Sequence, residues 1–183
     1  MISLDEAYIL LDKHLKSINL KKHCLATSVI MRELAKRLNE NEMHWEIIGL
    51  LHDLDFDETR DNPERHTLIT ERILSDYDFP QEYIRAIKAH NELTGVKRET
   101  TLDFALAASE TITGLIIATA KVYPDKRISS VRVKSIKKRM KEKAFARNVN
   151  RDTIRECKRI GISLDDFIEL SIKAMTDIEE KLL

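Results

Sequence analysis

The chain has 183 residues, of which 43% are hydrophobic and 34% are charged; this excludes a disordered protein and predicts one globular domain over residues 1–183. The net charge is zero, and Cys24 and Cys157 are too far apart in sequence to indicate a disulfide framework or a thiolate zinc site. The N-terminal residues do not resemble a signal sequence, and no apolar stretch suggests a membrane span. We therefore expect a cytoplasmic protein without a membrane partner.

Helix signals occur along almost the whole chain, and only 4 glycines and 3 prolines interrupt them. "SLDE" from Ser3 resembles a capping box, "SLDD" from Ser163 indicates the start of the last helix, and Asn62 and Pro63 are typical of a helix start. No alternating pattern predicts a strand, so the expected fold class is all-α. Apolar periodicity predicts helices over about residues 3–18, 20–38, 42–54, 63–75, 81–90, 102–122 and 130–147, and a last helix from 163.

The charges are distributed unevenly. Residues 40–61 contain eight acids and one arginine, whereas residues 126–151 contain eleven lysines and arginines and one acid. An acidic region favours cations and a basic segment favours anionic ligands. Within the basic segment, Lys143 and Arg147 lie four residues apart on the expected helix, so they are candidate substrate-binding residues. The competing interpretation is a solvated helix surface.

Side chains with metal-binding chemistry lie on apolar helix faces. The i, i+3, i+4 and i+7 neighbours of four histidines are mostly apolar or small, and these histidines are His23, His52, His66 and His90. Glu110 lies on a similar face, and Asp53 directly follows one of the histidines. A single inward histidine is usually an ordinary core residue, but this set together favours a buried metal site. His14 and His44 lack such neighbours and are expected to be ordinary.

Imidazoles and carboxylates without thiolates suit Fe, Mn, Co, Ni or Zn. Six candidate ligands exceed the number that one tetrahedral zinc uses, so the cofactor is predicted to be one or two divalent transition-metal ions. Asp53 can present two oxygens and is the natural bridge between two ions.

Five sequence segments carry a family resemblance: "HCLATSVIMREL", "GLLHDLDFD", "RHTLITERIL", "IKAHNE" and "SETITGLI". The order of their histidines and acids resembles the HD-domain superfamily of metal-dependent phosphohydrolases, and within it the small bacterial and archaeal HDIG-type hydrolases. This resemblance implies a compact helical bundle with a metal-binding core over about residues 20–120. The segment from about 125 to 183 would be a basic, helical C-terminal extension.

The resemblance also implies a function. The metal ligands would be His23, His52, Asp53, His66, His90 and Glu110. The implied reaction is hydrolysis of a phosphomonoester or phosphodiester of a nucleotide-like small molecule by a metal-activated hydroxide, with Asp53 as the catalytic residue. Two residues depart from the family pattern: Asp55 stands where the HDIG branch has Gly, and Glu110 stands where Asp is usual.

Other functions remain open at this level. Some proteins of the superfamily are di-iron oxygenases, and the change to Glu110 also fits a non-catalytic regulatory domain. Nucleic-acid binding through residues 126–151 is less favoured, because Phe145 is the single aromatic residue available there for stacking on bases. The sequence specifies neither the metal nor the substrate, and it leaves a homo-oligomer open.

Overall fold

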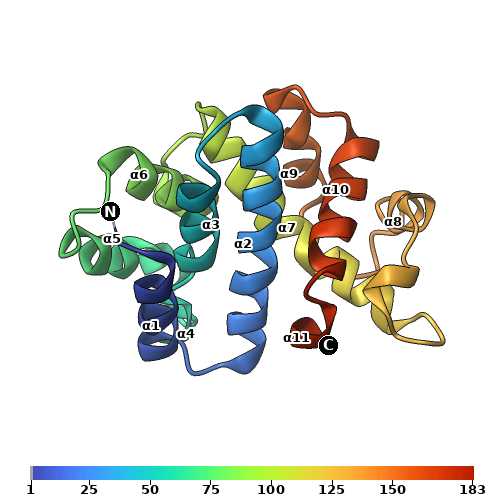
Figure 1. Ribbon diagram of the computed structural model, residues 1–183, viewed down its shortest axis with the longest axis horizontal. Helices are drawn as coiled ribbons and strands as arrows, with labels where there is room; N and C mark the ends of the chain where they lie inside the picture. The colour runs from blue at the N-terminus through green and yellow to red at the C-terminus, as the bar shows by residue number, and fades with distance from the viewer. Residues whose placement is uncertain (1) are drawn as a thin grey trace.

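The computed structural model describes residues 2–183, and every regular element in that range is helical, which confirms the all-α prediction (Figure 1). The α-helices are α1 (Leu4–His14), α2 (Ile18–Leu38), α3 (Glu42–Leu51), α4 (Phe56–Thr59), α5 (Leu68–Ser75), α6 (Gln81–His90), α7 (Thr101–Lys121), α8 (Val133–Arg139), α9 (Arg151–Arg155), α10 (Leu164–Thr176) and α11 (Glu179–Leu182). Short 3-10 turns are η1 (Pro63–Arg65), η2 (Glu92–Thr94), η3 (Ile128–Ser130) and η4 (Glu156–Ile160).

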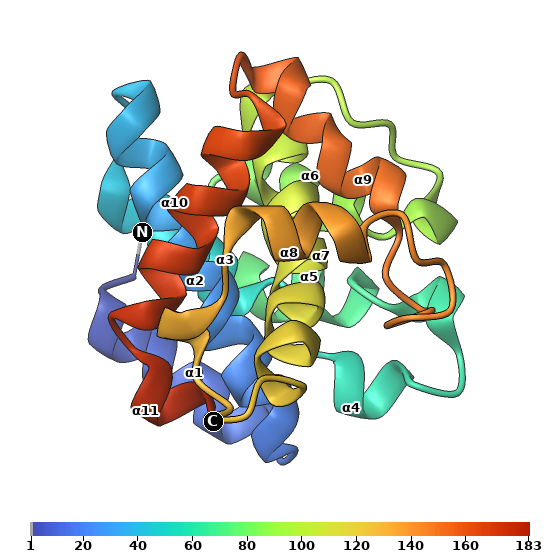
Figure 2. The same cartoon turned by 90° about the vertical axis from the view of Figure 1, so that its right-hand side faces the viewer.

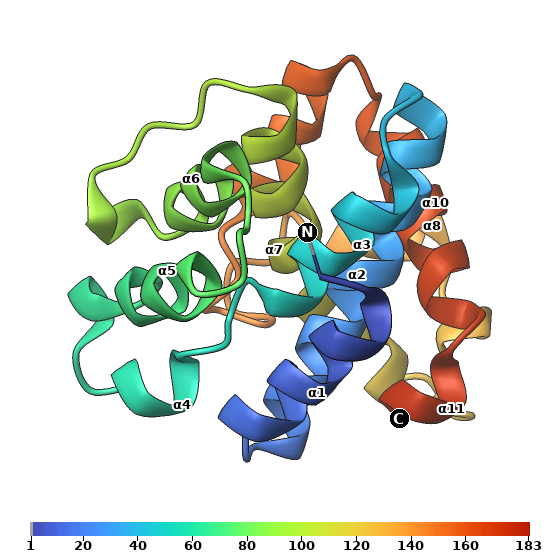
Figure 3. The same ribbon diagram turned by 60° about the vertical axis from the view of Figure 1, so that its left-hand side comes forward.

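Helix α7 forms the centre of the bundle. It contacts α2 and α6, and also α9 and η4 from the C-terminal part of the chain. The helices α4, α5 and α6 lie together on one side, while α10 and α11 lie on the other (Figure 3). Because α10 packs on α2 and α7, the C-terminal extension covers the same core as the N-terminal helices.

The expectation that no stretch is long and apolar enough for a membrane was wrong for α7. Thr101–Lys121 reaches that length and composition. More than half of its most apolar window is buried inside the protein. Its packing against helices on several sides accounts for this apolar character, as is typical of a core helix.

Side-chain caps explain where several helices begin. Ser3 and Glu6 form the predicted capping box of α1, and the Asn41 side chain accepts from the backbone of α3. Thr100 and Asp103 form another capping box at the start of α7. These caps satisfy backbone N–H groups that have no partner within the helix.

Four predicted helices are shorter than expected. The helices expected over residues 3–18 and 42–54 end at His14 and Leu51. The helix expected from Pro63 is interrupted at Thr67, whose φ of 78° lies in the left-handed region, and α5 begins only after it. The basic helix ends at Arg139 rather than near 147. Residues 137–143 bring like charges four apart, which destabilises a helix, and the Arg151 guanidinium binds carbonyls beyond Glu142 that a helix would use. Lys143 and Arg147 therefore do not share a helical face.

Gly49 allows α2 and α3 to approach closely. A Cβ at this position would lie 2.8 Å from Ser28 Cα and 3.0 Å from Ser28 N. The contact is with backbone, which cannot rotate away as a side chain can. The absence of a side chain at Gly49 thus sets the spacing of the two helices that carry His23 and His52.

Candidate metal centre

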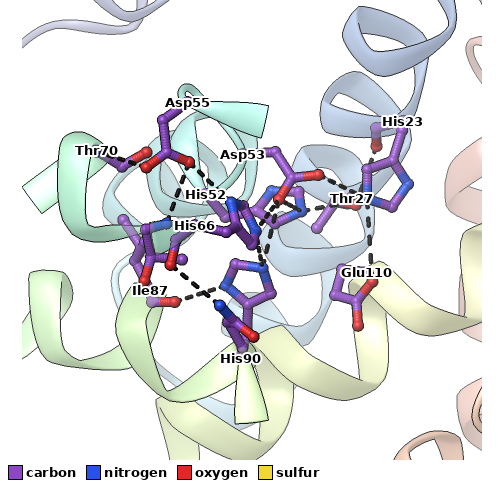
Figure 4. Close-up of polar contacts among 12 residues, drawn as sticks. His23, Thr27, His52, Asp53, Asp55, His66, Thr70, Ile87, His90 and Glu110 are labelled. Atoms are coloured by element: carbon purple, nitrogen blue, oxygen red, sulfur yellow. Dashed lines mark hydrogen bonds and ion pairs between the residues drawn. The ribbon is translucent and has the colours of Figure 1, made fainter. Parts of the chain in front are cut away.

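Five of the six predicted ligands meet inside the bundle (Figure 4). His23 comes from α2, His52 ends α3, and Asp53 follows it. His66 lies between η1 and α5, and His90 is the last residue of α6. Four separate segments thus deliver their side chains to one place.

The ligand atoms form two groups that share Asp53. The first pair is His23 and His52, whose Nε2 atoms are 3.2 Å apart; the second pair is His66 and His90, also with Nε2 atoms 3.2 Å apart. Asp53 Oδ1 lies 3.1 Å from His66 Nε2 and 3.3 Å from His90 Nε2. Its other oxygen, Oδ2, is 3.6 Å from His23 Nε2. Oδ1 also lies 3.5 Å from His52 Nε2, so Asp53 faces both pairs and its Oδ2 is turned toward His23.

Backbone carbonyls fix the tautomers of two histidines. His52 Nδ1 is 2.8 Å from the Gly49 carbonyl, and His90 Nδ1 is 2.6 Å from the Ile87 carbonyl. A carbonyl only accepts hydrogen bonds, so each Nδ1 must carry the hydrogen. The Nε2 of each neutral ring then presents a lone pair to the centre.

A hydroxyl does the same for His23. The Thr113 hydroxyl donates to the Glu110 carbonyl at 2.7 Å, so it accepts from His23 Nδ1 at 2.9 Å. His23 Nε2 is left with a lone pair that faces the lone pair of His52 Nε2. Two such lone pairs at this distance repel unless a cation or a proton lies between them.

Asp55 holds the fourth histidine. Its carboxylate contacts His66 Nδ1 at 2.8 Å. The same carboxylate accepts from the backbone N–H groups of Thr67, Ile69 and Thr70 at 3.0 to 3.1 Å. Asp55 thus satisfies the free N–H groups at the start of α5 and orients His66 with a single side chain. This acid is a structural partner of a ligand rather than a residue facing the substrate.

Burial and mutual charge shift the protonation of the centre. Burial lowers the pKa of His52 to about 3, so this ring is neutral. Burial also lowers the pKa of His66, but hydrogen bonds to Asp53 and Asp55 outweigh it and raise that pKa to about 9. Burial raises the pKa of Asp53, but the surrounding histidines bring it well below its usual value. The centre without an ion therefore holds a proton on His66 that a cation can replace.

The donor set fits divalent transition-metal ions. It offers converging imidazole nitrogens and a carboxylate that faces both pairs, with the outer ring nitrogens already bound to acceptors. Metal-binding histidines show this arrangement, in which the second nitrogen donates to a carbonyl or carboxylate. These residues could hold one ion per pair.

Glu110 lies at the edge of the centre and belongs to neither group. Its Oε2 is 4.0 Å from His23 Nε2, and the Thr111 hydroxyl donates to its other oxygen. Burial raises the pKa of Glu110. Ligation by Glu110 thus stays a prediction, while its position beside the first pair keeps it within the same cavity.

The centre opens into a cavity of about 510 Å³. Phe56, Asn91, Asn148 and Asn150 line it together with all the predicted ligands except the buried His52, and no lysine or arginine is among the described lining residues. The three asparagines were not predicted, because nothing in the sequence separates them from other loop asparagines. Asn91 also donates to the His66 carbonyl at 3.1 Å, so it supports the second pair.

Other predicted residues lie away from this cavity. Lys143 and Arg147 line a different, neighbouring cavity. Among the acids of residues 40–61, Asp57 accepts from the backbone N–H groups of Lys16 and Ser17, which gives it a structural role before α2. His44, which was expected to be ordinary, contacts the Tyr83 hydroxyl outside the centre.

Comparison with family models matches the HD domain over residues 20–138, which is more than half of the chain. The chain belongs to the HD-domain family. The match covers all six predicted ligands and confirms the resemblance read from the motifs. Members of this family usually are metal-dependent phosphohydrolases that act on phosphorylated small molecules. No curated protein and no solved structure gives a match.

Proposed function

We propose that this HD-domain protein hydrolyses a phosphomonoester or phosphodiester of a nucleotide-like small molecule with one or two divalent transition-metal ions. One observation carries the proposal. Four imidazole Nε2 atoms and both oxygens of Asp53 converge beside an open cavity, with the outer nitrogens of the rings already bound. This arrangement suits ions that also bind a substrate in that cavity.

Bound divalent ions would supply a nucleophile at neutral pH and neutralise charge on the phosphoryl oxygens. The four histidines would hold the ions in place. Asp53, the proposed catalytic residue, would accept a hydrogen bond from the attacking water and orient it toward phosphorus. The amides of Asn148 and Asn150 line the cavity and can donate to phosphoryl oxygens.

The shape of the cavity supports a nucleotide-like substrate. Its volume of about 510 Å³ lies in the range of small-molecule sites. Leu20, Phe56 and Val149 provide apolar wall beside the polar centre. An apolar wall next to metal ligands suits a molecule with a flat or apolar part and a phosphate.

A phosphate-release screen under anaerobic conditions tests the proposal. Protein loaded with Mn²⁺, Fe²⁺, Co²⁺, Ni²⁺ or Zn²⁺ would be offered nucleotides and other phosphate esters, with Asp53→Asn as the control. We expect phosphate release without oxygen by the wild type alone. Turnover only with iron and oxygen would favour an oxygenase, and retained metal without any turnover would favour a regulatory domain.

A further inference from the structure

A second cavity adjoins the metal centre. It has a volume of about 460 Å³ and shares two lining residues, Val149 and Asn150, with the cavity of the centre. These two shared residues belong to the segment that follows α8, which runs beside α9 (Figure 2). A molecule bound at the metal centre therefore has to extend only past Val149 and Asn150 to enter the second cavity.

The two cavities differ sharply in charge. Five cationic side chains and one acid line the second cavity: Lys141, Lys143, Arg147, Arg151, Arg155 and Asp152. The cavity of the metal centre has no lysine or arginine among its described lining residues. An anionic group of a substrate that does not reach the ions can pair with the cationic side chains of the second cavity.

The cations of the second cavity fall into two classes. Arg151 donates to the carbonyls of Ala146, Val149 and Glu142, and Arg155 pairs with Asp152 at 2.7 Å. These contacts fix the chain around the cavity. By contrast, Lys141, Lys143 and Arg147 are exposed and form no ion pair within residues 2–183.

Three like charges without a counterion, on a segment fixed by a fourth cation, form a preorganised anion site. Their mutual repulsion is relieved when a multivalent anion binds. Guanidinium and ammonium groups together suit phosphate, which accepts several charge-assisted hydrogen bonds at once. A solvated surface would explain the exposure of these side chains, but not their shared position in a cavity that adjoins the metal centre.

We propose that the second cavity binds a further phosphate group of the substrate, so that the substrate carries at least two phosphates. The scissile phosphate lies at the metal centre, and the other phosphate lies against Lys143, Arg147 and Lys141. This inference rests on the proposed function for the reaction, but the anion site itself does not depend on hydrolysis. A small bisphosphorylated molecule fits this site better than a nucleic acid, because stacking aromatics are nearly absent from residues 126–151.

Binding of inorganic pyrophosphate to the metal-free protein tests the site without any turnover. The variant Lys143→Gln/Arg147→Gln removes two exposed charges that form no side-chain hydrogen bond or ion pair within residues 2–183, and Lys121→Gln/Lys158→Gln removes two exposed charges outside the second cavity. By calorimetry, we expect the first variant to bind pyrophosphate on the order of tenfold more weakly than the wild type, and the control to match the wild type. Equal affinity in the wild type and both variants would overturn the proposal.

Hydrolysis by the Mn²⁺-loaded protein tests the link to the substrate. We expect the ratio of kcat/KM for adenosine 3′,5′-bisphosphate to that for AMP to fall about tenfold in Lys143→Gln/Arg147→Gln, mainly through KM. An unchanged ratio would overturn the proposal. If the wild type releases no phosphate from any probe, the proposed function fails and pyrophosphate binding still decides the anion site. Salt-sensitive binding of long DNA that excludes pyrophosphate would replace the proposal with a nucleic-acid surface.

Discussion

The two histidine pairs of the centre are built differently. His23 and His52 come from α2 and α3, which pack closely at Gly49. His66 lies in an irregular segment and depends on Asp55, a side chain that also caps α5. The first pair is therefore fixed by helix packing, whereas His66 of the second pair is held by one buried carboxylate. The two pairs should respond to different mutations.

The largest effect is expected where the two pairs meet. Asp53→Asn keeps the size of the side chain but removes the charge that faces both pairs. We expect activity to fall more than about a hundredfold, since even the loss of a residue that only supports a ligand costs 10–100-fold. The number of metal ions per chain, measured by mass spectrometry, should fall because both pairs lose the same charged partner. A variant that retains two ions per chain would contradict the bridging role.

The second pair alone should respond to Asp55. In Asp55→Asn, the amide no longer offers a charged acceptor to His66 Nδ1 and the start of α5. We expect the metal-binding step at His66 and His90 to lose about 10–100-fold in affinity. The free energy of unfolding should fall by about 1–2 kcal/mol because the cap is weakened.

Asp57→Asn is the matched control for Asp55. It also removes a carboxylate that accepts from backbone N–H groups, but those groups precede α2 and lie outside the cavity. This variant should lose some stability without a change in either metal-binding step. Equal losses of metal affinity in both variants would show that Asp55 acts only through general stability.

The first pair should respond to helix spacing. Gly49→Ala places a methyl group against the backbone at Ser28. Overpacking of this kind costs about 1–3 kcal/mol, which exceeds the gain of about 1 kcal/mol in helix propensity. Denaturant unfolding should show the loss. Gly114→Ala is the control, because its methyl group would meet only the Val149 side chain at 3.4 Å. Equal stability of the two variants would contradict the close packing at Gly49.

The stability of the metal-free protein should also depend on pH, through one histidine of each pair. His52 has a folded pKa of about 3 against 6.5, so the unfolded chain binds more protons as the pH falls below 6.5. His66 has a folded pKa of about 9, so its stabilising contribution is lost as the pH rises from 6.5 through 9. Stability should peak near pH 6.5 and fall by up to about 1.4 kcal/mol per pH unit on each side.

Thermal unfolding at several pH values checks this profile. The variant His66→Gln should lose the alkaline decline and keep the acidic one. Saturating metal should also remove the alkaline decline, because the ion takes the place of the proton on His66. A flat profile between pH 6.5 and 9 in the metal-free wild type would contradict the charge assigned to His66.

The first pair could be predicted from sequence more fully than the second. Helical spacing predicted that His23 and His90 lie on helices and that a third helix reaches His52. In the structure these residues lie within or at the ends of regular helices. Helical spacing did not predict the irregular segment that contains His66, where Asp55 contacts the His66 ring and the backbone of Thr67. Asp55 stood out in sequence as a departure from the HDIG pattern, yet its partners lie 11 to 15 residues away and are brought close only by the fold.

The basic segment shows the same limit. Its charge predicted an anion site, and its periodicity predicted a helix that the structure does not contain beyond Arg139. Like-charge repulsion and the contacts of Arg151 outweighed local helix propensity. Composition thus located the charge correctly, while its relation to the metal cavity emerged only from the packing of α9 on α7.

The central proposal is that each histidine pair would hold a divalent ion, with Asp53 between the two pairs. Anomalous diffraction at the manganese edge, from crystals of the protein grown with Mn²⁺, tests it most directly. We expect two peaks about 3.5–4 Å apart, one beside His23 and His52 and one beside His66 and His90, with Asp53 between them. Peaks away from these side chains, or no peak at saturating Mn²⁺, would contradict the claim.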